Sequence, residues 1–94
     1  MTTYIVFTRE ETLDQEELDT YSRTPDKLKG HPITVRVGYG EFEVLEGPSI
    51  EGVVILEFPD MDAARNWYHS PAYQAAAQHR FKGARYRSII VQGV

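Results

Sequence analysis

Apolar residues fall into short runs whose spacing switches between the period of a strand and that of a helix. Residues 3–8 are rich in β-forming side chains, and residues 33–39 alternate apolar and polar positions with a period of two. Residues 52–58 are almost wholly apolar, and residues 86–92 form another β-rich run. The pattern therefore predicts four strands. After the second, Phe42 and Val44 alternate with glutamates and continue the strand pattern beyond a glycine-rich bend.

Helical signals fill the two longer intervals. Asp14 is a good N-cap, and Glu17 three residues later completes a capping box, so a helix is expected to begin there. Thr24-Pro25 interrupts this helix, because the residue before a proline disfavours the helical conformation. A further turn through Leu28 is expected to end at Gly30.

The second interval predicts a helix in two parts. Asp60 is the expected N-cap of a helix that runs to about Tyr68 with Trp67 on its apolar side. Ser70 and Pro71 then restart the helix as N-cap and first helical residue, and Tyr73 faces inward. The order of elements is β-α-β-β-α-β, which predicts an α+β, ferredoxin-like antiparallel sheet in a single domain over residues 1–94.

Three of the four predicted strands are apolar on both faces. A sheet with one face in water should alternate apolar and polar residues, but residues 3–8, 52–58 and 86–92 do not. Two short helices cover one face only, and a bare apolar face usually marks an interface. We therefore expect a homodimer with sheet packed on sheet. The alternative is a monomer in which the loop 38–52 covers the sheet, although its four glutamates make it a poor lid.

Composition narrows the class of protein. The 94 residues include no cysteine, so disulfides, thiolate metal sites and a cysteine nucleophile are excluded. The net charge of −4 argues against nucleic acid as the main partner. The basic segment 79–87 interleaves aromatic residues with four cations. It is interpreted as a solvated turn with a few ion pairs, and the alternatives are an RNA surface or an anion site. With neither a basic, apolar leader nor a membrane span, a soluble cytoplasmic protein is expected.

Several of these motifs resemble one family. Val54-Ile55-Leu56-Glu57-Phe58-Pro59, Trp67-Tyr68 and Ser70-Pro71, together with Arg80, Ala84 and Arg87-Ser88, resemble the core motif of the domain-of-unknown-function family 1330. That family is similar to the dimeric α/β-barrel superfamily, so the resemblance implies two ferredoxin-like sheets paired into a barrel. Cofactor-free monooxygenases and isomerases occur in the wider superfamily. Family members usually carry Gly-Gly-Arg before strand two and Arg-Gly-Gly after it, where this chain has Pro32-Ile33-Thr34 and Gly38-Tyr39-Gly40.

Glu57 is the sharpest catalytic candidate, because it is a carboxylate at the end of an apolar strand. If buried, its pKa would rise and it could act as a general base. The alternative is a structural ion pair with Arg36, Arg80 or Arg87, and these arginines are also candidate ligand-binding residues.

His31 and His69 are further candidates for proton transfer. Neither they nor His79 have the spacing of metal ligands, so no metal site is predicted and surface or capping roles are the alternative. Tyr39, Tyr68 and Tyr86 are candidate pocket hydroxyls. Trp67 and Tyr73 are interpreted as packing between helix and sheet.

No nucleotide or other cofactor motif is present, so no cofactor is predicted. Three functions remain open. The first is a homodimer that binds a small apolar or aromatic molecule between sheet and helices, with Glu57, Arg36 and Tyr39 setting the polarity. The second is a cofactor-independent monooxygenase or isomerase. The third is a non-catalytic structural or interaction module, which predicts an interior without a cavity.

Overall fold

Seven elements alternate along the chain, and the computed structural model describes all of residues 1–94. Their order is β1 (Thr3–Thr12), α1 (Gln15–Arg23), β2 (Thr34–Gly38), β3 (Gly52–Phe58), α2 (Met61–Tyr68), α3 (Pro71–Gly83) and β4 (Ala84–Gln92). This order confirms the predicted ferredoxin-like arrangement, in which the second helical segment is split into α2 and α3.

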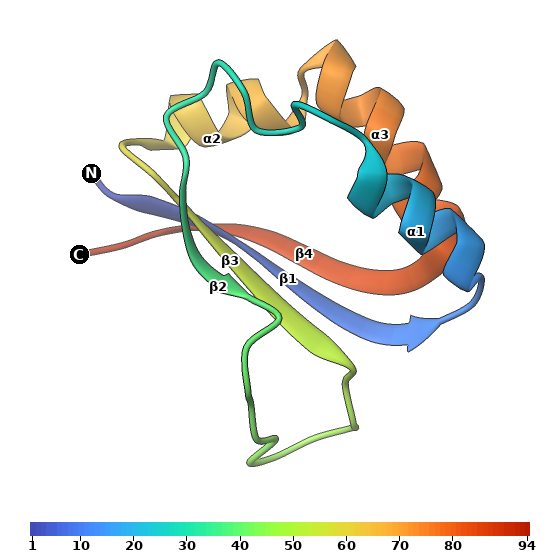
Figure 1. Cartoon of the computed structure of the whole chain (residues 1–94). Coiled ribbons are helices and arrows are strands. Elements are labelled where there is room, and N and C mark those ends of the chain that lie inside the picture. Colours follow the sequence, from blue (N-terminus) through green and yellow to red (C-terminus); the bar gives the residue numbers. More distant parts are fainter.

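The four strands form one antiparallel sheet in the order β2-β3-β1-β4. In β1, one of the two inner strands, Ile5 lies opposite Leu56 of β3 on one side and Ile90 of β4 on the other. All three helices lie against the same face of this sheet, as Figure 1 shows. We call this the helix face and the opposite side the outer face.

The core lies between the helix face and the helices. Alternate residues of β1 and β3 point into it, and α2 and α3 supply two large rings, so that its main members are Ile5, Phe7, Leu56, Phe58, Trp67 and Tyr73. The Trp67 indole N–H donates a hydrogen bond to the carbonyl oxygen of Lys27 at 2.9 Å. That bond satisfies the only polar atom of a side chain that is otherwise packed on carbon. The predicted packing role of Trp67 and Tyr73 is thus confirmed.

Local capping signals fix where the helices begin. The Asp14 carboxylate accepts from the backbone N–H groups of Glu16 and Glu17, and the Ser70 hydroxyl accepts from that of Tyr73. The predicted capping box is wrong in its second half. The carboxylate of Glu17 does not return to Asp14 but lies 2.7 Å from the Nδ1 atom of His79 and so joins α1 to α3.

Several predicted boundaries differ from the structure. β1 and β4 are longer than predicted, because they pair with each other beyond residue 8 after an irregularity between Arg9 and Glu11. β2 is shorter and ends at Gly38, and residues 39–51 form an irregular loop instead of continuing the strand. Residues 25–30 form turns without a helix, and Gly30 takes a left-handed φ of 81°.

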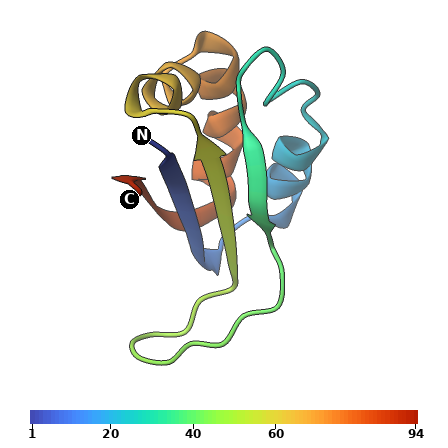
Figure 2. The same cartoon turned by 90° about the vertical axis from the view of Figure 1, so that its left-hand side faces the viewer.

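The outer face carries no covering segment. Its side chains alternate with the core residues along three strands, and its apolar members are Tyr4, Val6, Val53, Ile55, Ile89 and Val91. The loop 39–51 extends past the end of the sheet and does not fold over it (Figures 1 and 2). The alternative of a monomer with this loop as a lid is therefore wrong.

Candidate functional site

A cavity of about 290 Å³, which we call the cleft, opens between the helix face and the helices. Its floor is apolar and comes from Phe7 of β1 and from Val54 and Leu56 of β3, and the buried Trp67 of α2 also lines it. A volume near 300 Å³ lies at the lower end of the range of small-molecule sites, about 300–1,000 Å³. The cleft is therefore large enough for a small planar molecule and too small for a large cofactor.

Tyr39 forms one wall of the cleft and is held by three contacts. Its N–H donates to the Val53 carbonyl at 2.9 Å, its hydroxyl lies 2.6 Å from that of Tyr86, and the Arg9 guanidinium lies 5.1 Å from its ring centroid. Its φ of 60° is unusual for a residue with a side chain. Such strain persists only where the surroundings fix it, and here they hold the phenol against the cleft. Burial, followed by the hydrogen bond to Tyr86, raises the pKa of Tyr39.

A second pair of phenols lies deeper. The hydroxyls of Tyr21, on α1, and Tyr73, on α3, are 2.9 Å apart, and Tyr21 also lines the cleft. Burial raises the pKa of both groups, and the charge of Arg80 partly opposes the rise for Tyr73. Both phenols are therefore neutral hydrogen-bonding groups at physiological pH.

Lys27 lines the cleft beside the end of α1. Its ammonium donates to the carbonyl oxygens of Tyr21 and Thr24, each at 2.8 Å, and to that of Ser22 at 3.2 Å. These are carbonyls at the C-terminal end of the helix, where a cation is favoured. Burial lowers the pKa of Lys27. Its donors are already used within the chain, so its role is structural.

Arg80 is the one buried charge of the molecule. The residue is 3% exposed, and its guanidinium lies 5.0 Å from the ring centroids of Phe7 and Tyr86 and 4.8 Å from that of Phe81. It takes part in none of the salt bridges, and its buried Nε has no acceptor. The prediction of a solvated turn over residues 79–87 is therefore wrong, because the segment is the end of α3 and the start of β4 and Arg80 is buried. The predicted ion pairs are present and join Arg85 to Glu11 and Arg87 to Glu10.

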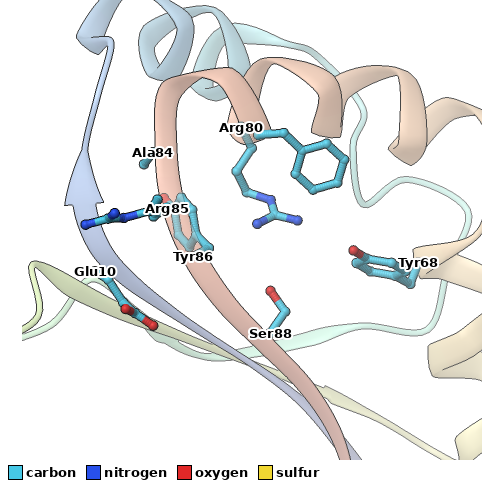
Figure 3. Close-up of a pocket in the computed structure, with 8 residues that line it drawn as sticks. Glu10, Tyr68, Arg80, Ala84, Arg85, Tyr86 and Ser88 are labelled. Atoms are coloured by element: carbon cyan, nitrogen blue, oxygen red, sulfur yellow. The ribbon is translucent and has the colours of Figure 1, made fainter.

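Arg80 and Tyr86 also line a second, more polar cavity of about 430 Å³, which we call the polar hollow. Figure 3 shows the Arg80 guanidinium pointing into it, with the hydroxyls of Tyr68 and Ser88 directed toward the same space. Neither of these hydroxyls makes a hydrogen bond within the chain. The structure thus brings together the predicted ligand-binding residues Arg80 and Tyr68, and it adds Ser88, which the sequence analysis missed.

Glu57 does not line the cleft. It lies between the core residues Leu56 and Phe58 on β3, so its side chain projects from the outer face. Both of its carboxylate oxygens accept from Arg36, at 3.1 Å from Nε and 3.2 Å from Nη2. This hydrogen-bonded pair raises the pKa of the Arg36 guanidinium. The predicted alternative, a structural ion pair at the end of the sheet, is what the geometry shows, and neither residue sets the polarity of the cleft.

The remaining candidates lie apart from the cleft. His31 lines a separate shallow hollow with Glu57, where no hydrogen bond joins the two side chains. His69 is the C-cap of α2, as the capping interpretation expected. Arg87 projects from the outer face, since the neighbouring positions Tyr86 and Ser88 face the polar hollow.

No group of three His, Asp or Glu side chains is arranged to hold a metal ion. None of the helices combines the length and apolarity required to cross a bilayer.

The residues missed by sequence reasoning are those of the cleft itself. Phe7, Val54 and Leu56 were recognised as apolar strand residues, but not as its floor. The period of two in β1 and β3 was the available signal, since it places these three residues on the face that also carries the core. The same signal would have placed Glu57 on the opposite face.

By its fold and its cleft the protein is a ferredoxin-like α+β protein with a cavity between its sheet and its helices. Within that class, residues 2–94 match the model of the domain of unknown function DUF1330, so the chain belongs to this family. The family resemblance noted in the sequence is thereby confirmed. No curated protein sequence matches the chain.

Solved structures give the same fold. The RPA0582 protein of unknown function from Rhodopseudomonas palustris is 23% identical, with a TM-score of 0.70 over 99% of this chain and 82% of the other. A dimeric ferredoxin-like protein of unknown function from Jannaschia sp. CCS1 has a TM-score of 0.74 at 14% identity, covering 99% of this chain and 100% of the other. SnoaB, a cofactor-independent oxygenase from Streptomyces nogalater, has a TM-score of 0.61 at 16% identity, covering 99% and 92%. At these identities the likeness is one of fold.

Proposed function

We propose that the protein is a homodimer in which each subunit binds a small apolar or aromatic molecule in its cleft. The observation that carries the binding function is the cleft itself, a cavity of about 290 Å³ whose floor is Phe7, Val54 and Leu56. A non-catalytic structural module predicts an interior without such space. Apolar lining with a few placed polar groups is the usual composition of a small-molecule site.

The outer face supports the homodimer. Ile89 and Val91 are about half exposed there, beside the less exposed Val6, Val53 and Ile55. A contiguous apolar surface of this kind is uncommon on a monomer. The solved structure from Jannaschia sp. CCS1, which has this fold, is that of a dimeric protein. In the proposed dimer the outer faces of two copies pack against each other, which leaves the clefts on the outside.

Binding is better supported than catalysis. SnoaB shares the fold and is a cofactor-independent oxygenase, which makes an oxygenase the second candidate. The cleft, however, contains no carboxylate and no imidazole among the residues that line it. Glu57 is paired with Arg36, and His31 and His69 lie elsewhere. The proposed general bases are therefore not positioned to act on a molecule in the cleft.

Titration with benzamide, a neutral aromatic probe, tests the cleft by nuclear magnetic resonance. We expect saturable shifts at Val54, Leu56 and the Trp67 indole N–H. Val35→Asp, which places a carboxylate in the wall of the cleft, should weaken binding at least about tenfold, because the charge loses hydration when the probe enters. Val44→Asp is the matched control, since Val44 is a part-exposed valine of the loop outside the cleft. Shifts that never saturate, or equal losses in both variants, would contradict the proposal.

Sedimentation tests the dimer. The protein should sediment as a dimer, and Ile55→Asp on the outer face should produce monomers, because a charge buried at an apolar interface is costly. Thr34→Asp, an exposed position at the edge of the same face, is the control and should leave the dimer intact. A wild-type protein that sediments as a monomer at tens of micromolar would refute the dimer.

A further inference from the structure

The guanidinium of Arg80 is a buried cation without an anion. Buried charges in proteins are normally paired or hydrogen-bonded, because removing them from water costs several kcal/mol. Arg80 is 3% exposed, makes no salt bridge, and has an Nε–H group with no acceptor. The rings of Phe7, Phe81 and Tyr86 compensate part of the charge through cation–π contacts. The rings accept from none of the in-plane N–H groups of the guanidinium. The Tyr73 hydroxyl is a neutral partner for Arg80, but the Nε–H group has no acceptor and no anion balances the charge.

Two further donors face the same space. The Tyr68 and Ser88 hydroxyls point into the polar hollow toward Arg80 (Figure 3), and neither is hydrogen-bonded within the chain. The other charged groups of the hollow are already satisfied, since Glu10 pairs with Arg87 and Arg85 pairs with Glu11. The hollow therefore presents one unpaired cation and two free hydroxyls around a cavity of about 430 Å³.

We propose that the polar hollow is a receptor for a carboxylate, and that the molecule bound by the protein is a small aromatic or apolar carboxylic acid. This inference rests on the proposed small-molecule function and names its ligand class. The planar fork of an arginine matches the two oxygens of a carboxylate, and charge-assisted hydrogen bonds are the strongest kind. Arg80 lines both the polar hollow and the apolar cleft, so charged and apolar parts of one ligand have adjoining surfaces.

The charge balance favours a single carboxylate over a polyanion. One buried cation compensates one negative charge, and the two accompanying donors are neutral hydroxyls. The chain as a whole carries a net charge of −4, which repels multiply charged anions. The aromatic rings stacked around Arg80 favour an apolar group next to the carboxylate, where it shields the ion pair from water.

The test compares benzoate with benzamide, which has the same shape without the charge, in the wild-type protein. Benzoate should bind at least about tenfold more tightly, because a charge-assisted hydrogen bond is worth more than a neutral one. Benzoate, and not benzamide, should shift the Nε–H resonance of Arg80, a readout that needs no mutation. Inorganic phosphate should leave this resonance unchanged.

Substitutions then locate the carboxylate. Arg80→Gln should reduce benzoate binding to the level of benzamide, while Lys82→Gln, which removes an exposed cation from the same helix, α3, should leave it unchanged. Tyr68→Phe and Ser88→Ala should each weaken benzoate binding about two- to tenfold, since each removes one neutral hydrogen bond. If Arg80→Gln does not fold, these two variants still test whether the carboxylate binds in the polar hollow.

The outcomes separate the two proposals. If benzamide binds in the cleft but benzoate binds no better, or phosphate shifts the Arg80 resonance as strongly, the carboxylate receptor is refuted and the cleft function stands. If neither aromatic probe gives saturable shifts, the cleft function itself fails. Equal binding of benzoate by the wild type and Arg80→Gln would show that Arg80 is only a packing residue, and this too refutes the inference.

Discussion

Gly52→Ala is the substitution that most directly tests how the cleft wall is built. A Cβ atom added to Gly52 would lie 2.6 Å from Cδ1 and 2.9 Å from Cε1 of Tyr39, well inside ordinary van der Waals contact. The third neighbour, a guanidinium nitrogen of Arg9, is at an unstrained 3.8 Å. The Tyr39 ring must therefore move, and because Tyr39 is about half exposed it can swing toward solvent.

The cost follows from the contacts that the ring would leave. Its hydroxyl would lose the hydrogen bond to Tyr86, worth about 1 kcal/mol, and its face would lose the contact with Arg9, worth about 0.5–1 kcal/mol at an exposed site. The alanine returns about 0.5–1 kcal/mol, because glycine is unfavourable inside a strand. We expect Gly52→Ala to lower the free energy of unfolding by about 1 kcal/mol and to weaken benzamide binding in the cleft.

A double-mutant cycle with Tyr39→Ala isolates this cause. Urea unfolding at fixed protein concentration, followed by fluorescence of the single buried Trp67, gives the free energy of each variant. In the Tyr39→Ala background, Gly52→Ala should become neutral or stabilising, because the clashing ring is gone and the gain for the strand remains. An equal cost in both backgrounds would refute the claim that Tyr39 occupies the space above Gly52.

Two further predictions concern ionisable groups. Glu57→Gln should cost no more than about 1 kcal/mol of stability and should leave benzamide binding unchanged, because the pair with Arg36 is a partly exposed ion pair on the outer face; a large loss of binding would restore Glu57 as a site residue. Burial raises the pKa of Tyr21 and Tyr73 above the unfolded value of about 10, so the stability that they contribute is complete below pH 10 and is lost as the pH rises above it. As the pH is raised, Tyr21 should stay protonated until the protein unfolds. The phenolate absorbance that develops before unfolding should therefore be the same in Tyr21→Phe as in the wild type. A smaller absorbance in the variant would mean that Tyr21 ionises in the folded protein.

Much of the fold could be predicted because its signals are local. Asp14, Asp60 and Ser70 cap the helices where the sequence places them, and the side chain of each accepts from backbone N–H groups two or three residues further along the chain. The apolar character of β3 on both faces also followed from residues 52–58 alone. The capping-box prediction at Glu17 was wrong because a distant residue, His79, offered its carboxylate a different partner.

The candidate site was less predictable, because it depends on register and on distant contacts. Glu57 stood out as a carboxylate in an apolar strand, yet the pleat of β3 turns it to the outer face and to Arg36. The left-handed conformation of Tyr39 has no local signal, since this loop residue is held by Val53 of β3 and Tyr86 of β4.

The sequence by itself determined the element order, the helix starts and the two-faced strands, since each of these depends on residues close together in the chain. Only the tertiary structure decided which polar groups face the cleft. Arg80 shows the reason most clearly. In the sequence it is one of four cations between residues 79 and 87, but the fold encloses its guanidinium between rings from β1, α3 and β4. Burial without a counter-ion, from which the carboxylate receptor is inferred, arises only when those three elements pack together.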